Sequence, residues 1–256
     1  MNSRWIEDSF ALTGQAALVT GAAKGIGSNI ATSLAAAGAE LILVGRTTDS
    51  LGHTSAEVEK LGSRPRLLEC DLSDAKSVDL LLNELAKSRV DILVNNAGTI
   101  HRAPATEIKV EDKQRVLEVN LNSIFTITQR IGTQMVERKK GRIINIASLL
   151  SFQGGINVAP YVVSKHGILG LTRALANEWG GFGVNVNAIA PGYIATDNTK
   201  PLQDDRERSE GILKRIPLGR WGNPEDIGAV AVFLASRAAQ YINGEIITVD
   251  GGWMSR

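Results

Sequence analysis

The sequence predicts an α/β protein with a doubly wound, seven-stranded parallel sheet and helices on both of its faces. Short apolar runs recur along the chain with longer amphipathic segments between them, and a glycine-rich turn at residues 20–27 directly follows the first run. Strict alternation of strands and helices favours a parallel sheet that is covered on both faces. Right-handed crossovers then place helices on each side of it.

Seven short apolar runs have the length expected of buried strands. In chain order they lie at residues 16–20, 40–44, 66–70, 92–94, 142–146, 184–189 and 245–249. Residues 73–88 and 110–139 carry leucine, valine and isoleucine at three- and four-residue intervals, which predicts helices. Ser73 is a candidate N-cap of the first of these, and Gly38 ends an alanine-rich helix before the second strand.

Length and composition are those of a globular protein with a sizeable core. The 256 residues are 43% hydrophobic and 21% charged, which excludes an intrinsically disordered or fibrous chain. No linker, repeat or low-complexity tract interrupts the alternation, so we expect a single domain over residues 1–256. The net charge of +1 provides no basic field for nucleic acid, so no nucleic-acid partner is expected.

The chain shows no targeting or membrane signal. Its first ten residues mix charges with apolar side chains, unlike a signal peptide, and no run of about 18 uncharged apolar residues occurs. We therefore expect a cytoplasmic protein without a membrane partner. Cys70 is the single cysteine, which excludes an internal disulfide. We expect it to be a buried thiol, and we expect no metal site.

The turn after the first strand has the composition of a phosphate-binding loop. It reads Gly-x3-Gly-x-Gly, and a helical run follows it at residues 28–37; the turn contains Gly21, Lys24, Gly25, Ile26 and Gly27. Glycine lets the backbone pass close to a pyrophosphate, and a helix start presents free N–H groups with a partial positive charge. The turn therefore predicts a dinucleotide site, although a glycine-rich tight turn without a ligand would have the same composition.

The end of the second strand indicates which dinucleotide binds. An Asp or Glu at this place accepts hydrogen bonds from the ribose of NAD, whereas an Arg suits the 2′-phosphate of NADP. Arg46 follows the strand, no acid stands at positions 45 or 46, and Lys24 could reach the same phosphate from the turn. The pair predicts that NADP(H) is preferred and that NAD(H) can also serve. The alternative is that Arg46 and Lys24 are two solvated surface cations.

Two further strand ends bring small and polar residues to the same edge of the sheet. Asp71 and Leu72 follow the third strand, and Asn96, Ala97 and Gly98 follow the fourth. Open parallel sheets bind ligands at the carboxyl ends of their strands. We expect Asp71 to accept a hydrogen bond from the adenine amino group, and the small Ala97-Gly98 pair to allow the cofactor to approach closely. Turn chemistry alone would favour the same residue types.

A serine, a tyrosine and a lysine predict proton-transfer chemistry at this edge. Ser148 follows the fifth strand, and Pro160 marks the start of a helix on which Tyr161 and Lys165 are four residues apart and share a face. A free phenol has a pKa of about 10, and we expect the neighbouring ammonium to lower it so that Tyr161 can transfer a proton. Ser148 would hold the substrate oxygen. By itself, such a Tyr and Lys pair is typical of an amphipathic helix surface.

In this order, the motifs resemble the signature of the short-chain dehydrogenase/reductase family over almost the whole chain. They are Thr20-Gly21-x3-Gly25-x-Gly27, Asn95-Asn96-Ala97-Gly98, Ser148-x12-Tyr161-x3-Lys165 and Pro191-Gly192. The resemblance implies a Rossmann-type, NAD(P)-dependent oxidoreductase with Asn120 as a fourth catalytic residue, which in the family bends its helix and holds a water. It also implies that Lys165 binds the nicotinamide ribose and that the nicotinamide half contacts Pro191, Gly192, Ile194 and Thr196.

The variable segments are similar to the 2-dehydro-3-deoxy-D-gluconate 5-dehydrogenases and the 2-deoxy-D-gluconate 3-dehydrogenases. They lie at residues 144–155, 177–179, 191–196, 219–222 and 249–253. This resemblance implies a keto-sugar acid as the substrate. The family resemblance also implies a homotetramer that packs through the helices at residues 110–139 and 161–179.

A sugar-acid substrate requires a cation or several hydrogen-bond donors for its carboxylate. Arg102 and Gln153 follow strand ends closely, so we expect them to bind the substrate together with Ser148 and Tyr161. Two alternatives stay open. One is a 3-oxoacyl carrier-protein reductase on the same fold, and the other is a nicotinamide-sensing regulator without turnover.

Overall fold

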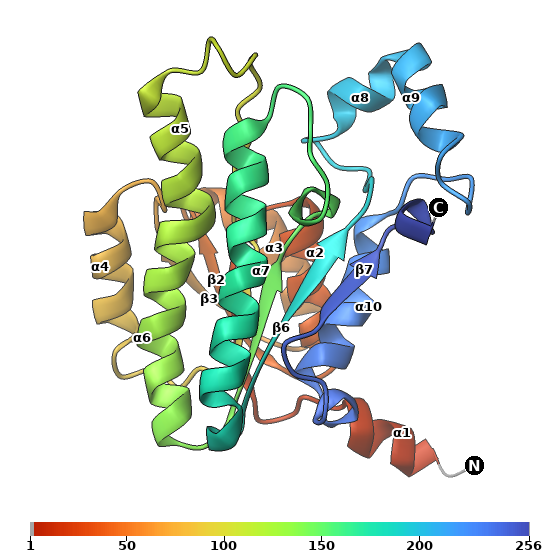
Figure 1. The fold of residues 1–256 in the computed structure, drawn as a ribbon. Helices are drawn as coiled ribbons and strands as arrows, with labels where there is room; N and C mark the ends of the chain where they lie inside the picture. Colours follow the sequence, from red (N-terminus) through yellow and green to blue (C-terminus); the bar gives the residue numbers. More distant parts are fainter. Residues whose placement is uncertain (1–2, 256) are drawn as a thin grey trace.

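The computed structural model describes residues 3–255 and contains one sheet of seven parallel strands (Figure 1). The order across the sheet is β3-β2-β1-β4-β5-β6-β7, and each neighbouring pair is parallel. The strands are β1 (Ala16–Thr20), β2 (Glu40–Gly45), β3 (Arg66–Glu69), β4 (Ile92–Asn95), β5 (Gly141–Ile146), β6 (Val184–Pro191) and β7 (Ile246–Val249). The predicted fold class is confirmed, and each strand lies where the sequence predicts one.

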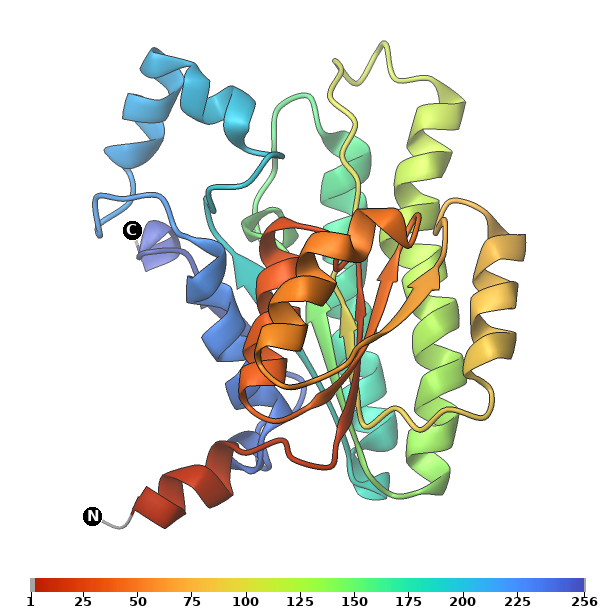
Figure 2. The same cartoon turned by 180° about the vertical axis from the view of Figure 1, so that it is seen from behind.

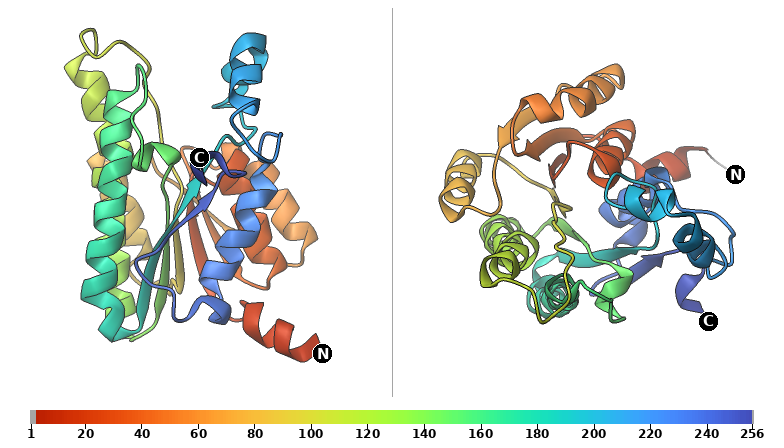
Figure 3. Two further views of the ribbon diagram at one scale, coloured as in Figure 1. Left: turned by 45° about the vertical axis from the view of Figure 1, so that its right-hand side comes forward. Right: turned by 90° about the horizontal axis from the view of Figure 1, so that it is seen from above.

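Helices cover both faces of the sheet, as Figure 2 and the left view of Figure 3 show. One face carries α2 (Gly25–Ala36), α3 (Gly52–Lys60) and α10 (Pro224–Ala235), whose apolar side chains share a core with the strands. The other face carries α4 (Ala75–Leu85), α5 (Val110–Leu117), α6 (Ser123–Glu137) and α7 (Ala159–Trp179). The sheet is therefore doubly wound, as predicted.

The spacing of apolar residues explains why these segments are helical. In α6 the buried side chains include Ile124, Ile127, Ile131 and Met135, which recur every three or four residues and so share one face. Burial of each such side chain stabilises the fold by about 1.5–3 kcal/mol. The same spacing in α4 buries Val78, Leu81, Leu82 and Leu85 in the core that it shares with the sheet.

The structure corrects one predicted helix cap and locates the bend at Asn120 that the family resemblance implies. The N-cap of α4 is Asp74, whose side chain accepts from the backbone N–H of Lys76, and not Ser73. Ser73 instead donates from its backbone N and its Oγ to Asp71 Oδ1. The helix predicted at residues 110–139 is interrupted by a π-helical turn, η2 (Glu118–Asn122), between α5 and α6.

The remaining elements lie at the two edges of the sheet. The pair α8 (Lys200–Asp204) and α9 (Arg206–Leu213) stands beyond the carboxyl edge, whereas α1 (Ser3–Phe10) lies at the amino edge beside η5 (Arg237–Ala239), as Figure 1 shows. The strand order reverses between β1 and β4, which is the point where doubly wound sheets bind dinucleotides. From residue 3 to residue 255, no helix is both long and apolar enough to cross a membrane.

Candidate active site

The glycine-rich turn between β1 and α2 leaves no room for side chains at two of its glycines. Gly21 has a φ of 63°, and a Cβ there would lie 2.8 Å from the Cα of Ala97. A Cβ at Gly27 would overlap the Gly21 carbonyl and the side-chain amide of Asn96. The turn therefore presents bare backbone at the switch point of the sheet.

Asn96 stabilises this turn by hydrogen bonds. Its Nδ2 donates to the carbonyls of Thr20 and Gly21 at 2.9 and 3.0 Å. The backbone N–H groups of Asn96 and Ala97 both donate to Thr20 Oγ1 at 3.1 Å. We expected the side chain of Asn96 to contact the cofactor. In the structure it binds the backbone of the turn that would hold the cofactor.

The start of α2 faces the loop that follows β6. Lys24 is the N-cap, and its side chain does not cap the helix, so the first N–H groups can bind an anion. Its Nζ lies 2.6 Å from Asp197 Oδ2 in an ion pair that is well exposed to solvent. A Cβ at Gly25 would lie 3.4 Å from Cγ2 of Thr196, which shows how closely the two loops approach. The adjacent Ile26 packs against the core under α2.

The ends of β2 and β3 carry charges of opposite sign, Arg46 after β2 and Asp71 after β3. Arg46 is exposed at the tip of β2. The pKa of the Asp71 carboxyl is lowered mainly by its hydrogen bonds from Ser73, and Arg115 and Arg46 contribute charge. Leu72 is buried in the core. An acid that the sequence analysis missed, Glu69, lies beside the tip in register with Gly45, where its Oε1 accepts from Thr48 N and Oγ1 at 2.7 and 3.1 Å.

Tyr161 and Lys165 lie one turn apart near the start of α7. Lys165 is 3% exposed, and its Nζ lies 5.6 Å from the centroid of the Tyr161 ring. The same Nζ donates to the carbonyl of Ile146, at the end of β5, at 2.6 Å. Ser148 follows that strand and caps η3 (Leu149–Ser151), since its Oγ accepts from the N–H of Leu150 at 3.1 Å. The fold thus brings together the serine, tyrosine and lysine that the sequence singles out.

The protonation of these groups differs from the sequence-based expectation. Burial raises the pKa of the Tyr161 phenol above its ordinary value, while a hydrogen bond with Ser148 and the charge of Arg102 act to lower it. Burial also lowers the pKa of Lys165 to about 8. The prediction that the ammonium would lower the Tyr161 pKa was therefore wrong, because loss of hydration outweighs the favourable charges.

Asn120 occupies the π-helical turn and is fully buried. Its Oδ1 accepts from the backbone N–H of Thr99 and its Nδ2 donates to the Thr99 carbonyl, both at 2.8 Å. Nδ2 also donates to Ser164 Oγ on α7 at 3.1 Å. A Cβ at Gly98 would lie 3.5 Å from Asn120 Oδ1 and 3.9 Å from Lys165 Nζ, so the loop after β4 passes between the two side chains.

Arg102 lies on the loop between β4 and α5, and it is exposed. Its Nη2 donates to the carbonyl of Asn198, on the loop after β6, at 3.4 Å. The charge of its guanidinium acts to lower the pKa of the Tyr161 phenol, by less than burial raises it. Arg102 is thus an exposed cation on a loop at the carboxyl edge of the sheet.

Gln153 lies beside a packed cluster of aromatic residues. Its Oε1 accepts from the indole N–H of Trp253 at 3.2 Å. Tyr193 lies between Trp253 and Trp221, with ring centroids 4.7 and 5.6 Å away. All three aromatic residues stand in segments that resemble the sugar-acid dehydrogenases, at residues 191–196, 219–222 and 249–253, but their proximity to Gln153 depends on the fold.

The loop after β6 holds the remaining residues expected at the nicotinamide. Pro191 ends the strand, and a Cβ at Gly192 would lie 2.6 Å from the Cα of Asp250. Ile194 is 3% exposed and packs in the core, whereas the backbone N–H of Thr196 donates to Thr199 Oγ1 at 3.0 Å. This loop runs from the core toward the glycine turn.

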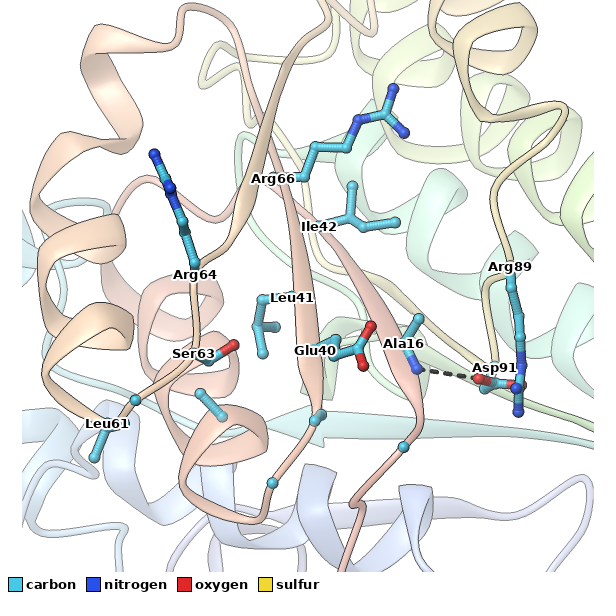
Figure 4. A pocket seen from close by; sticks show the side chains of 15 residues that line it. Ala16, Glu40, Leu41, Ile42, Leu61, Ser63, Arg64, Arg66, Arg89 and Asp91 are labelled. Atoms are coloured by element: carbon cyan, nitrogen blue, oxygen red, sulfur yellow. Dashed lines mark hydrogen bonds and ion pairs between the residues drawn. The ribbon is translucent and has the colours of Figure 1, made fainter.

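A cavity of about 660 Å³ lies at the opposite, amino edge of the sheet (Figure 4). Three arginines line it, but Arg89 pairs with the buried carboxylate of Asp91 at 2.9 Å and Arg66 with Glu84 at 2.7 Å. Asp91 also accepts from the backbone N–H of Ala16 at 3.0 Å. These charges lie at the amino ends of the strands, on the edge of the sheet opposite Tyr161. Within residues 3–255, no group of three or more His, Cys, Asp or Glu side chains is placed to hold a metal ion.

Comparisons with known proteins agree with this geometry. The family model described as enoyl-(acyl carrier protein) reductase matches residues 21–254. The 2-dehydro-3-deoxy-D-gluconate 5-dehydrogenase of Bacillus subtilis (strain 168) is 54% identical over 98% of this chain and 99% of its own length. A Beutenbergia cavernae structure with bound NADP at low occupancy is 49% identical, with a TM-score of 0.94 and coverage of 97% and 100%.

A third relative is the gluconate 5-dehydrogenase of Burkholderia cenocepacia J2315, solved in complex with NADP and tartrate. It is 34% identical, with a TM-score of 0.93, and the match covers 98% of this chain and 99% of that one. The fold and site define the protein as an NAD(P)-dependent oxidoreductase. The chain belongs to the short-chain dehydrogenase/reductase family, which confirms the predicted resemblance.

Proposed function

We propose that the protein interconverts a ketone and a secondary alcohol on a small keto-sugar acid, with NADP(H) as its preferred cofactor and NAD(H) as a second one. The observation that carries this proposal is the arrangement around the tyrosine. Tyr161 lies beside Lys165 and Ser148, while Arg102 adds a positive charge at the phenol. The relatives named for sugar-acid dehydrogenation support the same substrate class.

The cofactor site would lie along the carboxyl edge of the sheet. The glycine turn fits a pyrophosphate, because the absence of side chains at Gly21 and Gly27 lets its backbone pack directly against Ala97 and Asn96, and the first N–H groups of α2 have no side-chain cap. Arg46 and Lys24 are the cations proposed to face the 2′-phosphate, and relatives bind NADP. Asp71 and Leu72 would contact the adenine. The backbone at residues 96–98 and the loop at residues 191–196 would contact the rest of the cofactor.

Tyr161 acts as the general acid in the direction of ketone reduction. Its raised pKa keeps the phenol protonated at neutral pH, so it can donate its proton to the carbonyl oxygen as negative charge develops there. When bound, the nicotinamide supplies the hydride that the carbonyl carbon accepts. Ser148 holds the carbonyl oxygen by a hydrogen bond, which stabilises the developing charge.

Lys165 and Asn120 support the proton transfer. The pKa of Lys165, lowered to about 8, lets its ammonium exchange a proton close to neutral pH. Lys165 is also proposed to bind the nicotinamide ribose. Asn120 fixes the loop after β4 against α7, through Thr99 and Ser164, and keeps the backbone of Gly98 next to the lysine. We propose that it holds a water in the relay.

Arg102 and Gln153 would recognise the acid end of the substrate. A guanidinium forms charge-assisted hydrogen bonds with a carboxylate, and these are stronger than neutral ones. The amide of Gln153, on the segment that follows Ser148, would provide further donors. A neutral ketone would lack the carboxylate that both side chains are proposed to bind.

The assembly and domain organisation stay predictions. We propose a homotetramer that packs through α6 and α7, because Phe125 and Val163 on these helices are 48% and 58% exposed. We also propose that residues 1–256 form one dinucleotide-binding and catalytic domain. The cytoplasmic location expected from the sequence is likewise a prediction.

The test is a matrix of substrates and cofactors. Oxidation of NADPH and NADH would be followed with keto-sugar acids, simple ketones and a 3-oxoacyl thioester. We expect the highest kcat/KM with a keto-sugar acid and NADPH, and a value about 10²- to 10⁴-fold lower for Tyr161→Phe. A higher kcat/KM for the thioester or for neutral ketones would overturn the substrate class, and a higher one with NADH would overturn the cofactor preference.

A further inference from the structure

The short segment after β7 reaches back to the loop that follows β5. Figure 1 shows this C-terminal segment at the carboxyl edge of the sheet, beneath α8 and α9. Trp253 is 6% exposed there and packs with Leu149, Ile212 and Ile216. The guanidinium of Arg215 lies 3.9 Å from the centre of its ring. The indole thus joins the loop beside Ser148 to the end of α9.

The turn that carries this tryptophan is held in one conformation. Both carboxylate oxygens of Asp250 accept backbone N–H groups, from Gly252 and from Met254, each at 2.8 Å. Gly251 and Gly252 have φ values of 65° and 91°, which side chains rarely allow. A Cβ at Gly252 would lie 2.9 Å from Pro217 Cγ. The turn therefore delivers the indole to a fixed place.

The hydrogen bond from this indole determines which way the amide of Gln153 points. An indole N–H can only donate, so the atom that faces it at 3.2 Å must be the carbonyl oxygen Oε1. The Nε2 group then lies on the opposite side of the amide carbon. Among the residues that the structure describes, none accepts a hydrogen bond from Nε2. Its two N–H groups can therefore donate to a bound ligand.

We propose that Trp253 is a positioning residue for the substrate: it fixes the Gln153 amide so that the two Nε2–H donors face a carboxylate or hydroxyl oxygen of the sugar acid. This inference rests on the proposed function. Without the indole N–H, the amide can rotate and present its oxygen instead, which repels a carboxylate. Trp253 therefore acts through Gln153 and does not itself touch the reacting atoms.

The test replaces the indole while keeping an aromatic ring. Trp253→Phe removes the N–H and retains most of the packing. Trp221→Phe is the matched control, because Trp221 belongs to the same cluster but donates its N–H to Ser209 Oγ at 3.4 Å. We expect Trp253→Phe to raise KM for the keto-sugar acid about 3- to 10-fold, the effect of one hydrogen bond, with kcat within about 2-fold. The control should leave both within about 2-fold.

A double-mutant cycle separates positioning from packing. Gln153→Met removes the amide and keeps the length of the side chain. If Trp253 acts through Gln153, adding Trp253→Phe to Gln153→Met raises KM no further. Additive effects, or an equal loss in the Trp221→Phe control, would show that the indole serves the fold alone and would overturn the inference.

The proposed function and this inference can fail separately. If the parent reduces no keto-sugar acid, the proposed function fails, and the carboxylate assignment fails with it. The contact is still measured by the NMR resonance of the Trp253 indole N–H, which needs no substrate. We expect Gln153→Met to shift that resonance and leave the Trp221 indole unchanged. An unchanged Trp253 resonance would refute the positioning role whatever the substrate is.

Discussion

Replacing the buried lysine should make the protein more stable and abolish its activity. Lys165→Met removes an ammonium that is 3% exposed and whose pKa is lowered from 10.5 to about 8 by burial. Between these two pH values, the folded protein binds fewer protons at this site than the unfolded chain. The destabilisation caused by burying the charge is therefore fully present below pH 8 and fades as the pH rises toward 10.5.

The magnitude follows from the size of the shift. At 1.36 kcal/mol per unit, burying the charge costs about 3 kcal/mol at pH 7 and about 1 kcal/mol at pH 9.5. Methionine has a similar stem but loses the hydrogen bond to the Ile146 carbonyl, which contributes about 1 kcal/mol. We therefore expect the variant to be about 2 kcal/mol more stable than the parent at pH 7 and about equally stable at pH 9.5.

The assay is urea unfolding at both pH values, without cofactor and at one protein concentration. Lys87→Met, at an exposed lysine after α4, is the control and should change stability by less than about 0.5 kcal/mol at either pH. The reasoning that burial lowers the pKa of Lys165 would be refuted if the Lys165→Met variant were no more stable than the parent at pH 7. It would also be refuted if the gain in stability were the same at pH 9.5 as at pH 7. Turnover should be lost in either case, because we propose that the ammonium binds the nicotinamide ribose and supports proton transfer by Tyr161.

Four further predictions concern the site and its support. Tyr161→Phe should keep its affinity for NADPH, measured by fluorescence titration, and lose about 10²- to 10⁴-fold in turnover; a loss below about threefold contradicts its role. Arg102→Ala should raise KM for keto-sugar acids at least about 10-fold and leave the KM for neutral ketones unchanged, and an unchanged KM for keto-sugar acids excludes Arg102 as the anchor. Arg46→Asp should lower the NADPH-to-NADH ratio of kcat/KM by about 10-fold or more, since charge-assisted hydrogen bonds to the phosphate are lost. Gly132→Ala should lower the free energy of unfolding by about 1–3 kcal/mol, since its Cβ would overlap the Trp179 ring; an unchanged urea midpoint is the contrary result.

Local pattern determined the strands, the glycine turn and the pairing of Tyr161 with Lys165. Strand and helix periods are short-range properties, and residues four apart on a helix share a face in any fold. Parallel pairing then brings every strand end to one edge, so residues far apart in sequence, such as Gly21 and Ser148, could be assigned to one site. The interruption of the long helix at Asn120 was implied only by family resemblance, because no proline or glycine marks it.

Only the tertiary structure decided the charges and the long-range contacts. The direction of the Tyr161 pKa shift depends on how much water the fold removes from the phenol, which spacing along a helix does not reveal. The ion pair of Lys24 with Asp197 spans 173 residues, and the hydrogen bond of Trp253 with Gln153 spans 100. Such contacts depend on where whole loops lie over the sheet edge. The sequence alone therefore determined which groups meet at the reacting edge, and packing decided which way each of them points and what charge it carries.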